Sequence, residues 1–181
     1  VLTAMPNYPQ GRIHDGYGGL MRREQLNGVE VIRTVIYPTQ KASFIHRLTN
    51  YFSFVISSAL LGIFLLRKAD YLMVESPPLF LGISGIWLSW IKHARLIFNV
   101  SDLWPESAVQ LGLVRKSSLA HRLSAWLERW CYSSAWLITG QSRGILSYIV
   151  ERFPQKTTYR LSNGVDLGKF GGQYLSDDLR Q

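Results

Sequence analysis

Strand-like and helical runs alternate along the second half of the chain, and this alternation limits the possible folds more than any other feature of the sequence. The strand-like runs are short and apolar, whereas the runs between them are longer and helical in pattern. In chain order they are the strands Tyr71–Glu75, Arg95–Val100, Trp136–Thr139 and Thr158–Leu161, and the helices Pro77–His93, Ser117–Ser134 and Arg143–Phe153. Strands that alternate with helices are joined by right-handed crossovers and lie parallel. The pattern therefore predicts the α/β fold class, with a Rossmann-like parallel sheet and helices on both of its faces.

Before this region we expect the end of a buried strand at Val1–Ala4, two further strands and one long helix. Leu20–Leu26 and Val29–Ile36 are β-like, and Asn27-Gly28 between them is a strong signal for a two-residue hairpin turn. Lys41–Arg67 is typical of a single long helix, with Ser43 well placed as its N-cap. This helix joins the hairpin to the alternating region, so the chain fits one domain.

The composition narrows the class of protein. The chain has 181 residues, of which 47% are hydrophobic and 18% are charged, so it can bury one core and has too few charges for a disordered chain. Its net charge of +8 favours anionic partners such as phosphates, nucleic acid or an acidic lipid surface. The basic residues are scattered in pairs and no nucleic-acid-binding module is present, so we expect no nucleic acid among the partners.

Cysteine and histidine usage excludes several kinds of site. Cys131 is the single cysteine, so the chain cannot form an internal disulfide or a cysteine-based metal site, and a reducing cytoplasm suits it. Its position within a helical run is typical of a buried apolar residue. The histidines show no metal-ligand spacing to one another or to carboxylates, so we expect no metal at His14, His46, His93 or His121.

The segments that follow the strands are the expected place for a ligand, because parallel α/β sheets bind ligands outside the carboxyl ends of their strands. Each of these segments contains turn formers and small or polar side chains. They are Met5–Gly11, Ser76–Pro78, Ser101–Glu106, Gly140–Arg143 and Ser162–Asp166. The sequence has no GxGxxG fingerprint and no P-loop, so neither an NAD site nor a Walker-type ATP site is predicted.

Four of these segments together resemble a known family. Their order and spacing are similar to those in the amino-terminal domain of family 4 glycosyltransferases, and closest to bacterial O-antigen, capsule and colanic-acid transferases. The matching motifs are MPNYPQG at 5–11, SPPL at 76–79, VSDLWPES at 100–107 and NGVD at 163–166. The combination of DLWPES with NGVD is specific, and the resemblance extends from Val1 to Phe170.

The resemblance implies a domain organisation. Family members have the GT-B fold, in which an amino-terminal Rossmann-like domain handles the acceptor and a carboxy-terminal domain binds most of the nucleotide-sugar donor. Residues 1–170 would form the acceptor-side domain, and residues 171–181 would begin the interdomain linker. The family's first strand and glycine-rich loop would precede Val1, so we expect the chain to be a piece cut at both ends.

Three places differ from the usual family pattern. Asn99 stands where the family usually has Asp, Ser101 where many members have His, and Leu161-Ser162 where Ile-Pro is common. The serine at position 101 leaves the identity of a catalytic base open.

By resemblance, the complete protein would transfer a hexose or an acetamido sugar from a nucleotide diphosphate sugar, with retention at the anomeric carbon. The acceptor would be a polyprenyl-linked saccharide in the synthesis of lipopolysaccharide or another bacterial surface polysaccharide. No metal or other cofactor is expected, because helix termini, backbone amides and basic side chains stabilise the leaving diphosphate. Most of those groups would belong to the carboxy-terminal domain, so this chain alone would be inactive. The alternative is a non-catalytic membrane-associated or assembly subunit that needs a partner chain.

The strongest catalytic candidates lie in the loop after Val100. Asp102 would hydrogen-bond the acceptor hydroxyl or accept its proton, unless it only braces the loop or caps a helix. Glu106 is either a second carboxylate at the site or an acidic residue that favours a helix amino terminus. Trp104 either stacks on a sugar or packs within the protein. Ser101 is an acceptor-binding candidate in the same loop.

Other candidates are spread over the remaining segments. Asn7 and Tyr8 would bind the acceptor or form a rigid turn set by the flanking prolines, and Ser76 is grouped with them as an acceptor-binding residue. Ser142 and Arg143 either contact a phosphate at a helix amino terminus or form an ordinary cap. The candidates that would tie the interdomain hinge or touch the donor are Asn163, Gly164 and Asp166.

Two long uncharged stretches raise the question of a membrane. No charged residue occurs between positions 47 and 67 or from 76 to 91, and both stretches approach transmembrane length. Buried crossover helices and partial membrane insertion are both compatible with this pattern. In the second case Phe54 and Phe64 would enter lipid, and anionic headgroups would meet Arg67, Lys68, Lys92 and Arg95. The protein would then be cytoplasmic and peripheral to the inner face of the plasma membrane.

Overall fold

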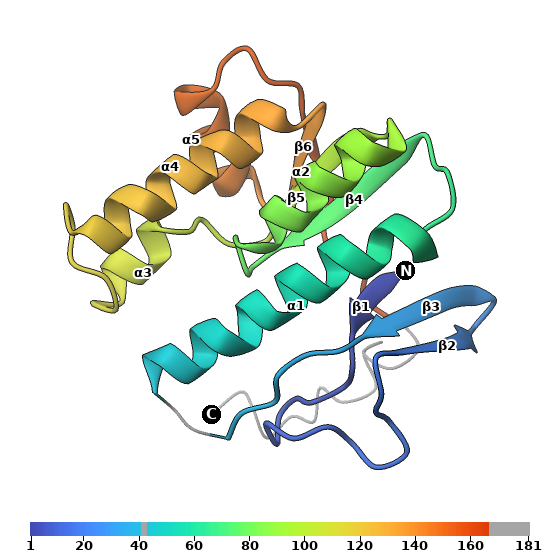
Figure 1. Cartoon of the computed structure of the whole chain (residues 1–181). Helices are drawn as coiled ribbons and strands as arrows, with labels where there is room; N and C mark the ends of the chain where they lie inside the picture. Colours follow the sequence, from blue (N-terminus) through green and yellow to red (C-terminus); the bar gives the residue numbers. More distant parts are fainter. Residues whose placement is uncertain (41–42, 167–181) are drawn as a thin grey trace, which may run out of the picture.

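The structure is a computed structural model that describes residues 1–40 and 43–166 (Figure 1). In chain order its elements are β1 (Leu2–Ala4), β2 (Met21–Leu26), β3 (Val29–Thr34), α1 (Phe44–Leu65), β4 (Tyr71–Ser76), α2 (Leu81–Lys92), β5 (Arg95–Val100), α3 (Glu106–Gln110), α4 (Leu119–Ser134), β6 (Leu137–Gly140), α5 (Arg143–Arg152) and β7 (Thr158–Arg160). The expected linker at 171–181, and the expected end of the domain at 167–170, lie outside the described residues.

The strands form two sheets. β4, β5, β6 and β7 make a four-stranded parallel sheet in sequence order, and at least one helix lies in each connection between neighbours. The second sheet has the order β1-β3-β2, in which β1 and β3 are parallel and β2 and β3 are antiparallel. The parallel sheet with its flanking helices confirms the predicted Rossmann-like α/β class.

The hairpin between β2 and β3 turns where Asn27-Gly28 predicts. Both residues have positive φ, at 50° and 81°, which is the conformation that a two-residue type I′ turn requires. The pairing of Leu26 with Val29 closes the turn. Local turn chemistry therefore determines the register of this antiparallel pair.

The second apolar helix begins later than the sequence pattern predicts. α2 starts at Leu81 rather than at Pro77, because a residue that precedes proline is disfavoured in helical conformation and Pro77 precedes Pro78. Tight turns occupy the intervening segment, in which the amides of Leu81 and Gly82 bond to the carbonyls of Pro78 and Leu79. The expectation that the two prolines open the helix is therefore wrong.

Two smaller differences concern α1 and the loop after β5. Ser43 occupies the N-cap of α1, as expected, but its side chain makes no capping hydrogen bond. The helix ends at Leu65 rather than at Arg67. A short helix, α3, begins at Glu106; it is not among the expected helices, but one of the two interpretations of Glu106 places this residue at a helix amino terminus.

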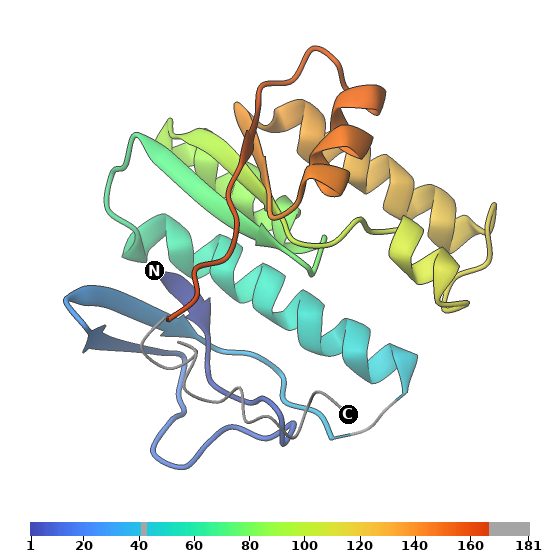
Figure 2. The ribbon, with the colours of Figure 1, turned by 180° about the vertical axis from the view of Figure 1, so that it is seen from behind.

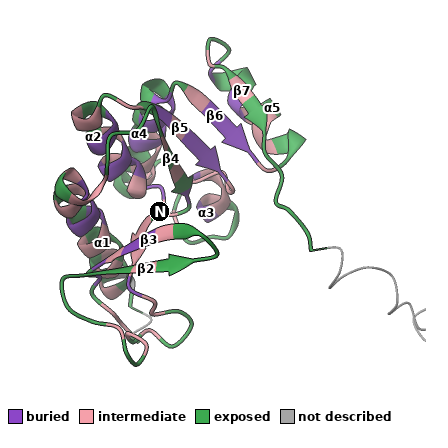
Figure 3. Cartoon of the chain, turned by 90° about the vertical axis from the view of Figure 1, so that its right-hand side faces the viewer, coloured by how far each residue is buried: buried purple, intermediate pink, exposed green. Residues whose placement is uncertain are grey.

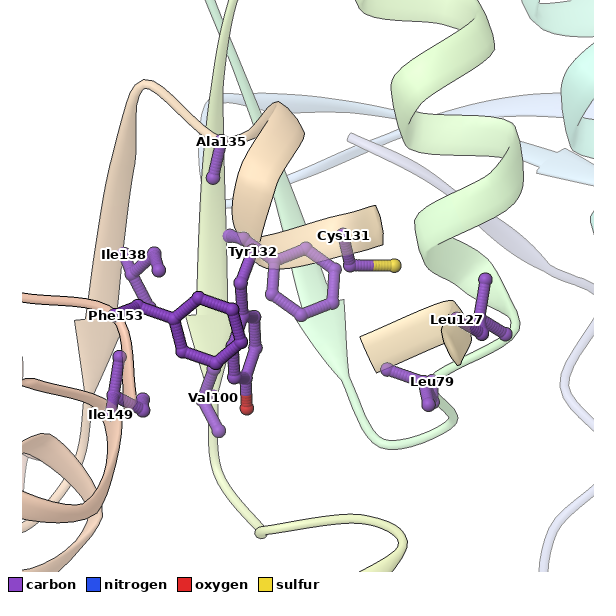
Figure 4. Close-up of a cluster of buried hydrophobic side chains, with 10 residues drawn as sticks. Leu79, Val100, Leu127, Cys131, Tyr132, Ala135, Ile138, Ile149 and Phe153 are labelled. Carbon is purple, nitrogen blue, oxygen red and sulfur yellow. The ribbon is translucent and has the colours of Figure 1, made fainter. Parts of the chain in front are cut away.

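The main core lies between the parallel sheet and helices α2, α4 and α5. Figure 4 shows the Tyr132 and Phe153 rings side by side; their centres are 5.2 Å apart, and Phe98 packs 5.9 Å from Tyr132. Cys131 is buried in the same cluster, as expected, and burial raises the pKa of its thiol to about 12, which makes it unreactive. Figure 3 shows that buried residues concentrate in β5 and β6, whereas β2 is exposed.

α1 joins the two sheets. The hydroxyl of Ser57 donates to the Val35 carbonyl at 2.6 Å and lies 3.2 Å from the Thr34 hydroxyl. Gly62 lies against α2, since a Cβ at that position would come within 2.8 Å of the Leu88 side chain. Among the described helices α1 is the one long and apolar enough to cross a membrane, over Ile45–Leu65. Its contact with Thr34 of β3 and its close packing on α2 attach one side of this helix to the protein.

Candidate functional site

The carboxyl ends of the parallel strands meet on one side of the molecule. In Figures 1 and 2, β1, β3 and β4 run toward the side where α1 begins. The ends of β4 and β5 are joined by a hydrogen bond from the Ser101 amide to the Ser76 carbonyl, at 2.8 Å. We name the region formed by residues 75–76, 99–102 and 139–142 the carboxyl edge.

A chain of hydrogen bonds links polar side chains across the carboxyl edge. The Thr139 hydroxyl donates to the side-chain oxygen of Asn99 at 2.5 Å, and the Asn99 amide nitrogen donates to Glu75 at 2.6 Å. The Ser101 hydroxyl donates to the other carboxylate oxygen of Glu75 and accepts from the Gln141 side chain at 2.6 Å. Because both of its oxygens accept a hydrogen bond, the Glu75 carboxylate is held in one orientation at the rim of the sheet.

Sequence reasoning missed Glu75, Thr139 and Gln141 as members of this site. A signal was available, because Glu75, Asn99 and Thr139 each occupy the next-to-last position of a strand and pair with one another in register. Polar residues at that position in three neighbouring strands break the apolar pattern of buried parallel strands. The register also gives a reason for Asn99 in place of the family's usual Asp, since an aspartate there would face the Glu75 carboxylate.

Asp102 follows β5 and is half-buried. Its Oδ2 atom accepts a hydrogen bond from the Ser107 hydroxyl at 3.0 Å, which braces the loop against the first turn of α3. A carboxylate offers about four acceptor positions, so this bond leaves Asp102 able to receive a ligand hydroxyl. Its role toward an acceptor stays a prediction. Trp104, in the same loop, packs against the main core, which favours its structural interpretation.

Glu106 pairs with a cation that it shares with a buried carboxylate. Its Oε1 atom lies 3.9 Å from Nη1 of Arg152, and the same nitrogen lies 3.2 Å from Oε2 of Glu128. Burial raises the pKa of Glu128 to about 7, although Arg152 acts in the opposite direction. This arrangement fastens α3 to α4 and α5, so the geometry favours a structural role for Glu106.

The segment after β1 is held by its own hydrogen bonds. The Asn7 side chain donates to the Met5 carbonyl at 3.2 Å, and the Asn7 carbonyl accepts the Gly11 amide at 2.7 Å. These bonds favour the rigid-turn interpretation of Asn7. Tyr8 is 85% exposed, so its ring is accessible to a ligand. Ser76 is buried and contributes its backbone carbonyl to the link between β4 and β5.

The segment after β6 forms the beginning of α5. Ser142 is its N-cap and accepts the Ile145 amide at 3.2 Å, which is an ordinary capping bond. Arg143 is exposed and lines an open groove of about 680 Å³ together with Arg160 of β7. Two guanidinium groups can receive an anionic group, although the Glu151 carboxylate lines the same groove and offsets part of their charge.

The residues expected at the hinge lie in an exposed stretch after β7. Asn163, Gly164 and Asp166 belong to the last part of the chain that the structure describes. Their roles toward a linker or a donor stay predictions. Over residues 1–40 and 43–166, no group of three His, Cys, Asp or Glu side chains is placed to hold a metal ion.

The two phenylalanines expected at a membrane have different surroundings. Phe64 is 82% exposed on α1, whereas Phe54 is half-buried. Arg67 and Lys68 are both exposed directly after α1. Of the two rings, Phe64 is therefore the better placed to meet lipid.

The other two basic residues expected there have partners within the protein. Lys92 donates to the Ile63 carbonyl at 2.6 Å, which ties the end of α2 to α1. The Arg95 guanidinium lies 5.2 Å from the centre of the Trp136 ring, at the start of the parallel sheet. Neither interaction removes the positive charge, but each ties the side chain to the protein.

Comparison with known proteins gives two matches. Residues 1–164 match the family described as "Glycosyl transferase 4-like domain". Over 117 residues the chain is 27% identical to the putative colanic acid biosynthesis glycosyl transferase WcaI of Escherichia coli (strain K12), an alignment that covers 64% of this chain and 29% of that protein. The match therefore spans less than a third of that relative's length.

Proposed function

The chain belongs to the glycosyl transferase 4-like family, as its motifs indicate, and from this premise we propose that it forms the acceptor-side part of a retaining glycosyltransferase. The reaction moves a hexose or acetamido sugar from a nucleotide diphosphate sugar to a polyprenyl-linked saccharide. Family membership supports sugar transfer, and the name of the Escherichia coli relative supports the synthesis of a bacterial surface polysaccharide as its setting.

The acceptor-side domain must orient one hydroxyl group of the acceptor sugar and allow its proton to be removed. The hydroxyl oxygen forms a bond to the anomeric carbon while the bond to the leaving diphosphate oxygen breaks, through an oxocarbenium-like transition state. The hydroxyl proton passes to a base or to the leaving diphosphate. A carboxylate fixed at the acceptor position assists by orienting the hydroxyl and by accepting the proton.

The polar carboxyl edge is the observation that supports this role most directly. Glu75 is oriented by Asn99 and Ser101, and Asp102 is braced by Ser107 in the next segment of the same edge. Sugar hydroxyls bind to carboxylates and amides that are already oriented, because less conformational entropy is lost on binding. Tyr8 adds an exposed ring that suits packing on a sugar face.

The donor side is proposed to lie mostly outside this chain. Arg143 and Arg160 offer two cations for a diphosphate in a groove that Glu151 also lines, and a carboxy-terminal domain would supply the other groups that neutralise it. Basic side chains and helix termini can do this without a metal ion, so the proposal includes no cofactor. A lipid-linked acceptor places the reaction at the cytoplasmic leaflet of the plasma membrane.

A transfer assay on the complete protein tests the proposal. Radiolabelled nucleotide sugars and a polyprenyl-linked saccharide are incubated with the enzyme, and labelled lipid product is measured. Asp102→Asn keeps the shape of the side chain and removes its charge, so kcat is expected to fall roughly 10²-fold or more. Asp15→Asn, in an exposed loop before β2, is the matched control and is expected to keep full activity.

Each result has a distinct meaning. Unchanged kcat in the Asp102→Asn protein would limit this residue to its bond with Ser107. Failure of the complete protein to transfer any sugar, together with intact folding, would favour the non-catalytic assembly subunit instead. The 181-residue chain by itself is expected to show no turnover, because most of the groups that neutralise the diphosphate are proposed to belong to a carboxy-terminal domain.

A further inference from the structure

Helices α1, α2 and α4 carry large apolar side chains that are exposed to solvent. A groove of about 450 Å³ runs between the three helices, and apolar side chains line it. The aromatic residues beside it form two pairs, with ring centres 5.7 Å apart on α2 and 5.6 Å apart on α4. We name the exposed set the tryptophan face; its members are Ile56, Leu60, Trp87, Trp90, Trp126 and Trp130.

The exposed charges on the three helices of the tryptophan face have one sign. Glu128 is the only acidic residue in the three helices, and it is buried against Arg152. Arg122 and Arg129 flank Trp126 at helical spacing, so they lie on the same side of α4. Arg67 and Lys68 follow the end of α1. An apolar surface on helices whose exposed charges are all positive is complementary to an anionic, amphipathic partner.

We propose that the tryptophan face docks this protein on an anionic lipid bilayer. The indole rings lie at the level of the headgroups, where aromatic residues with one polar atom are favoured, and the flanking arginines meet lipid phosphates. α1 lies along the bilayer surface rather than across it, because its other side is hydrogen-bonded to Thr34 of β3 and, through Lys92, to α2.

A lipid surface fits this face better than a second copy of the chain does. A symmetric dimer would bring the same surface together twice, so Arg122 and Arg129 of each copy would approach the cations of the other. Like charges at an apolar interface oppose association, whereas anionic headgroups neutralise them. The groove between the helices also offers space for part of an acyl or isoprenoid chain.

This inference rests on the proposed function, because the lipid-linked acceptor is what brings the protein to a membrane. α2 follows the Ser76–Pro78 loop, and Phe80 at its amino-terminal end packs 4.8 Å from Phe52 of α1. The apolar side of these helices therefore starts beside the carboxyl edge. A lipid-linked saccharide held at the bilayer surface would have its sugar close to that edge.

Vesicle flotation with the 181-residue chain tests the apolar contribution. Vesicles of phosphatidylcholine alone are compared with vesicles that also contain phosphatidylglycerol. Trp90→Ser with Trp126→Ser is expected to weaken binding to both vesicle types by roughly 100-fold, since each exposed ring gains on the order of 1.5 kcal/mol on burial. Leu20→Ser is the matched control, because Leu20 is 73% exposed, close to the 69% of Trp90, and lies outside the tryptophan face.

The electrostatic contribution is tested separately. Arg122→Gln with Arg129→Gln is expected to weaken binding to the anionic vesicles by roughly 30-fold, at about 1 kcal/mol for each charge, and to leave binding to neutral vesicles unchanged. The effect should shrink as salt is added. Arg22→Gln with Arg23→Gln, on β2, removes the same charge elsewhere and should have a much smaller effect.

Three results would overturn the proposal. The first is vesicle binding that neither pair of substitutions changes. The second is a dimer in analytical ultracentrifugation that the tryptophan substitutions dissociate while vesicle binding is absent. The third applies if the tryptophan variant proves to be unfolded: vesicle binding that Leu60→Ser, a substitution within the tryptophan face at a 57% exposed position, does not weaken. Flotation needs no sugar transfer, so a failed transfer assay with normal vesicle binding would refute the proposed function and leave this docking surface intact.

Discussion

Replacement of Glu128 by glutamine tests how this buried carboxylate, which shares Arg152 with Glu106 of α3, affects the stability of the fold. Glu128 is buried in α4, and its carboxylate lies 3.2 Å from Arg152, which also pairs with Glu106 at the start of α3. Burial raises the pKa of Glu128 from 4.5 to about 7, so the folded chain holds a proton there that the unfolded chain releases at lower pH.

The sign of the effect follows from this difference. Between about pH 4.5 and 7 the folded state binds more protons than the unfolded state, so the free energy of unfolding falls as the pH rises through that interval. A pKa difference of one unit corresponds to about 1.4 kcal/mol, so ionised Glu128 costs about 3 kcal/mol above pH 7. Glutamine has almost the same shape and no charge, and Arg152 retains Glu106 as a partner.

Glu128→Gln is therefore expected to stabilise the chain by up to about 3 kcal/mol at about pH 8, which is roughly 6–12 °C in Tm for a domain of this size. At about pH 4 the two proteins should melt at nearly the same temperature. Thermal unfolding followed by circular dichroism across this pH range measures both values. Glu151→Gln, at an exposed position of α5, is the control. A lower Tm for Glu128→Gln at about pH 8 would show that the ion pair with Arg152 outweighs the cost of burying the carboxylate, and would refute the reasoning.

Two other substitutions test the packing and the carboxyl edge. Asn99→Asp places a second carboxylate against Glu75, so the chain should lose about 1–3 kcal/mol of stability at neutral pH and recover part of it in acid. Urea unfolding at two pH values measures both effects. Equal stability of the variant at the two pH values would mean that residues 99 and 75 do not interact. Gly82→Ala forces a methyl group to within 2.2 Å of the Cys131 sulfur, so the free energy of unfolding should fall by about 1–3 kcal/mol in the same assay. An unchanged urea midpoint would show that α2 and α4 separate easily.

Short sequence patterns were sufficient to predict the elements that a few neighbouring residues determine. Asn27-Gly28 specifies a hairpin because both turn positions need positive φ, and the structure has the turn there. The four strands of the parallel sheet begin and end within a residue or so of the expected positions, because short apolar runs between helices have few alternatives. The prediction that α2 begins at Pro77 was wrong. Proline is common in the first turn of a helix, but a second proline disfavours helical backbone in the residue before it.

The carboxyl edge was not assembled from the sequence, because the polar residues near the strand ends indicate a shared site only once the register of the strands is known. Glu75, Asn99 and Thr139 are far apart in the chain, and only the pairing of β4 with β5 and of β5 with β6 brings them together. The candidates found by motif were those in loops, where small and polar residues stand out. A motif cannot identify a partner that is distant in the sequence. Glu106 pairs with Arg152, the last residue of α5, and no local pattern connects the two.

α2 is the element that links the carboxyl edge to the tryptophan face. It follows the Ser76–Pro78 loop, and its outer side carries Trp87 and Trp90. Its inner side is fixed by close approach, since a Cβ at Gly82 would meet Cys131 of α4 and a Cβ at Gly85 would lie 2.3 Å from Val74 of β4. A helix packed this closely cannot rotate about its axis without breaking those contacts. The orientation of the tryptophans therefore determines which way the carboxyl edge faces when the protein is docked, so one rigid helix would align a membrane surface with the site for an acceptor sugar.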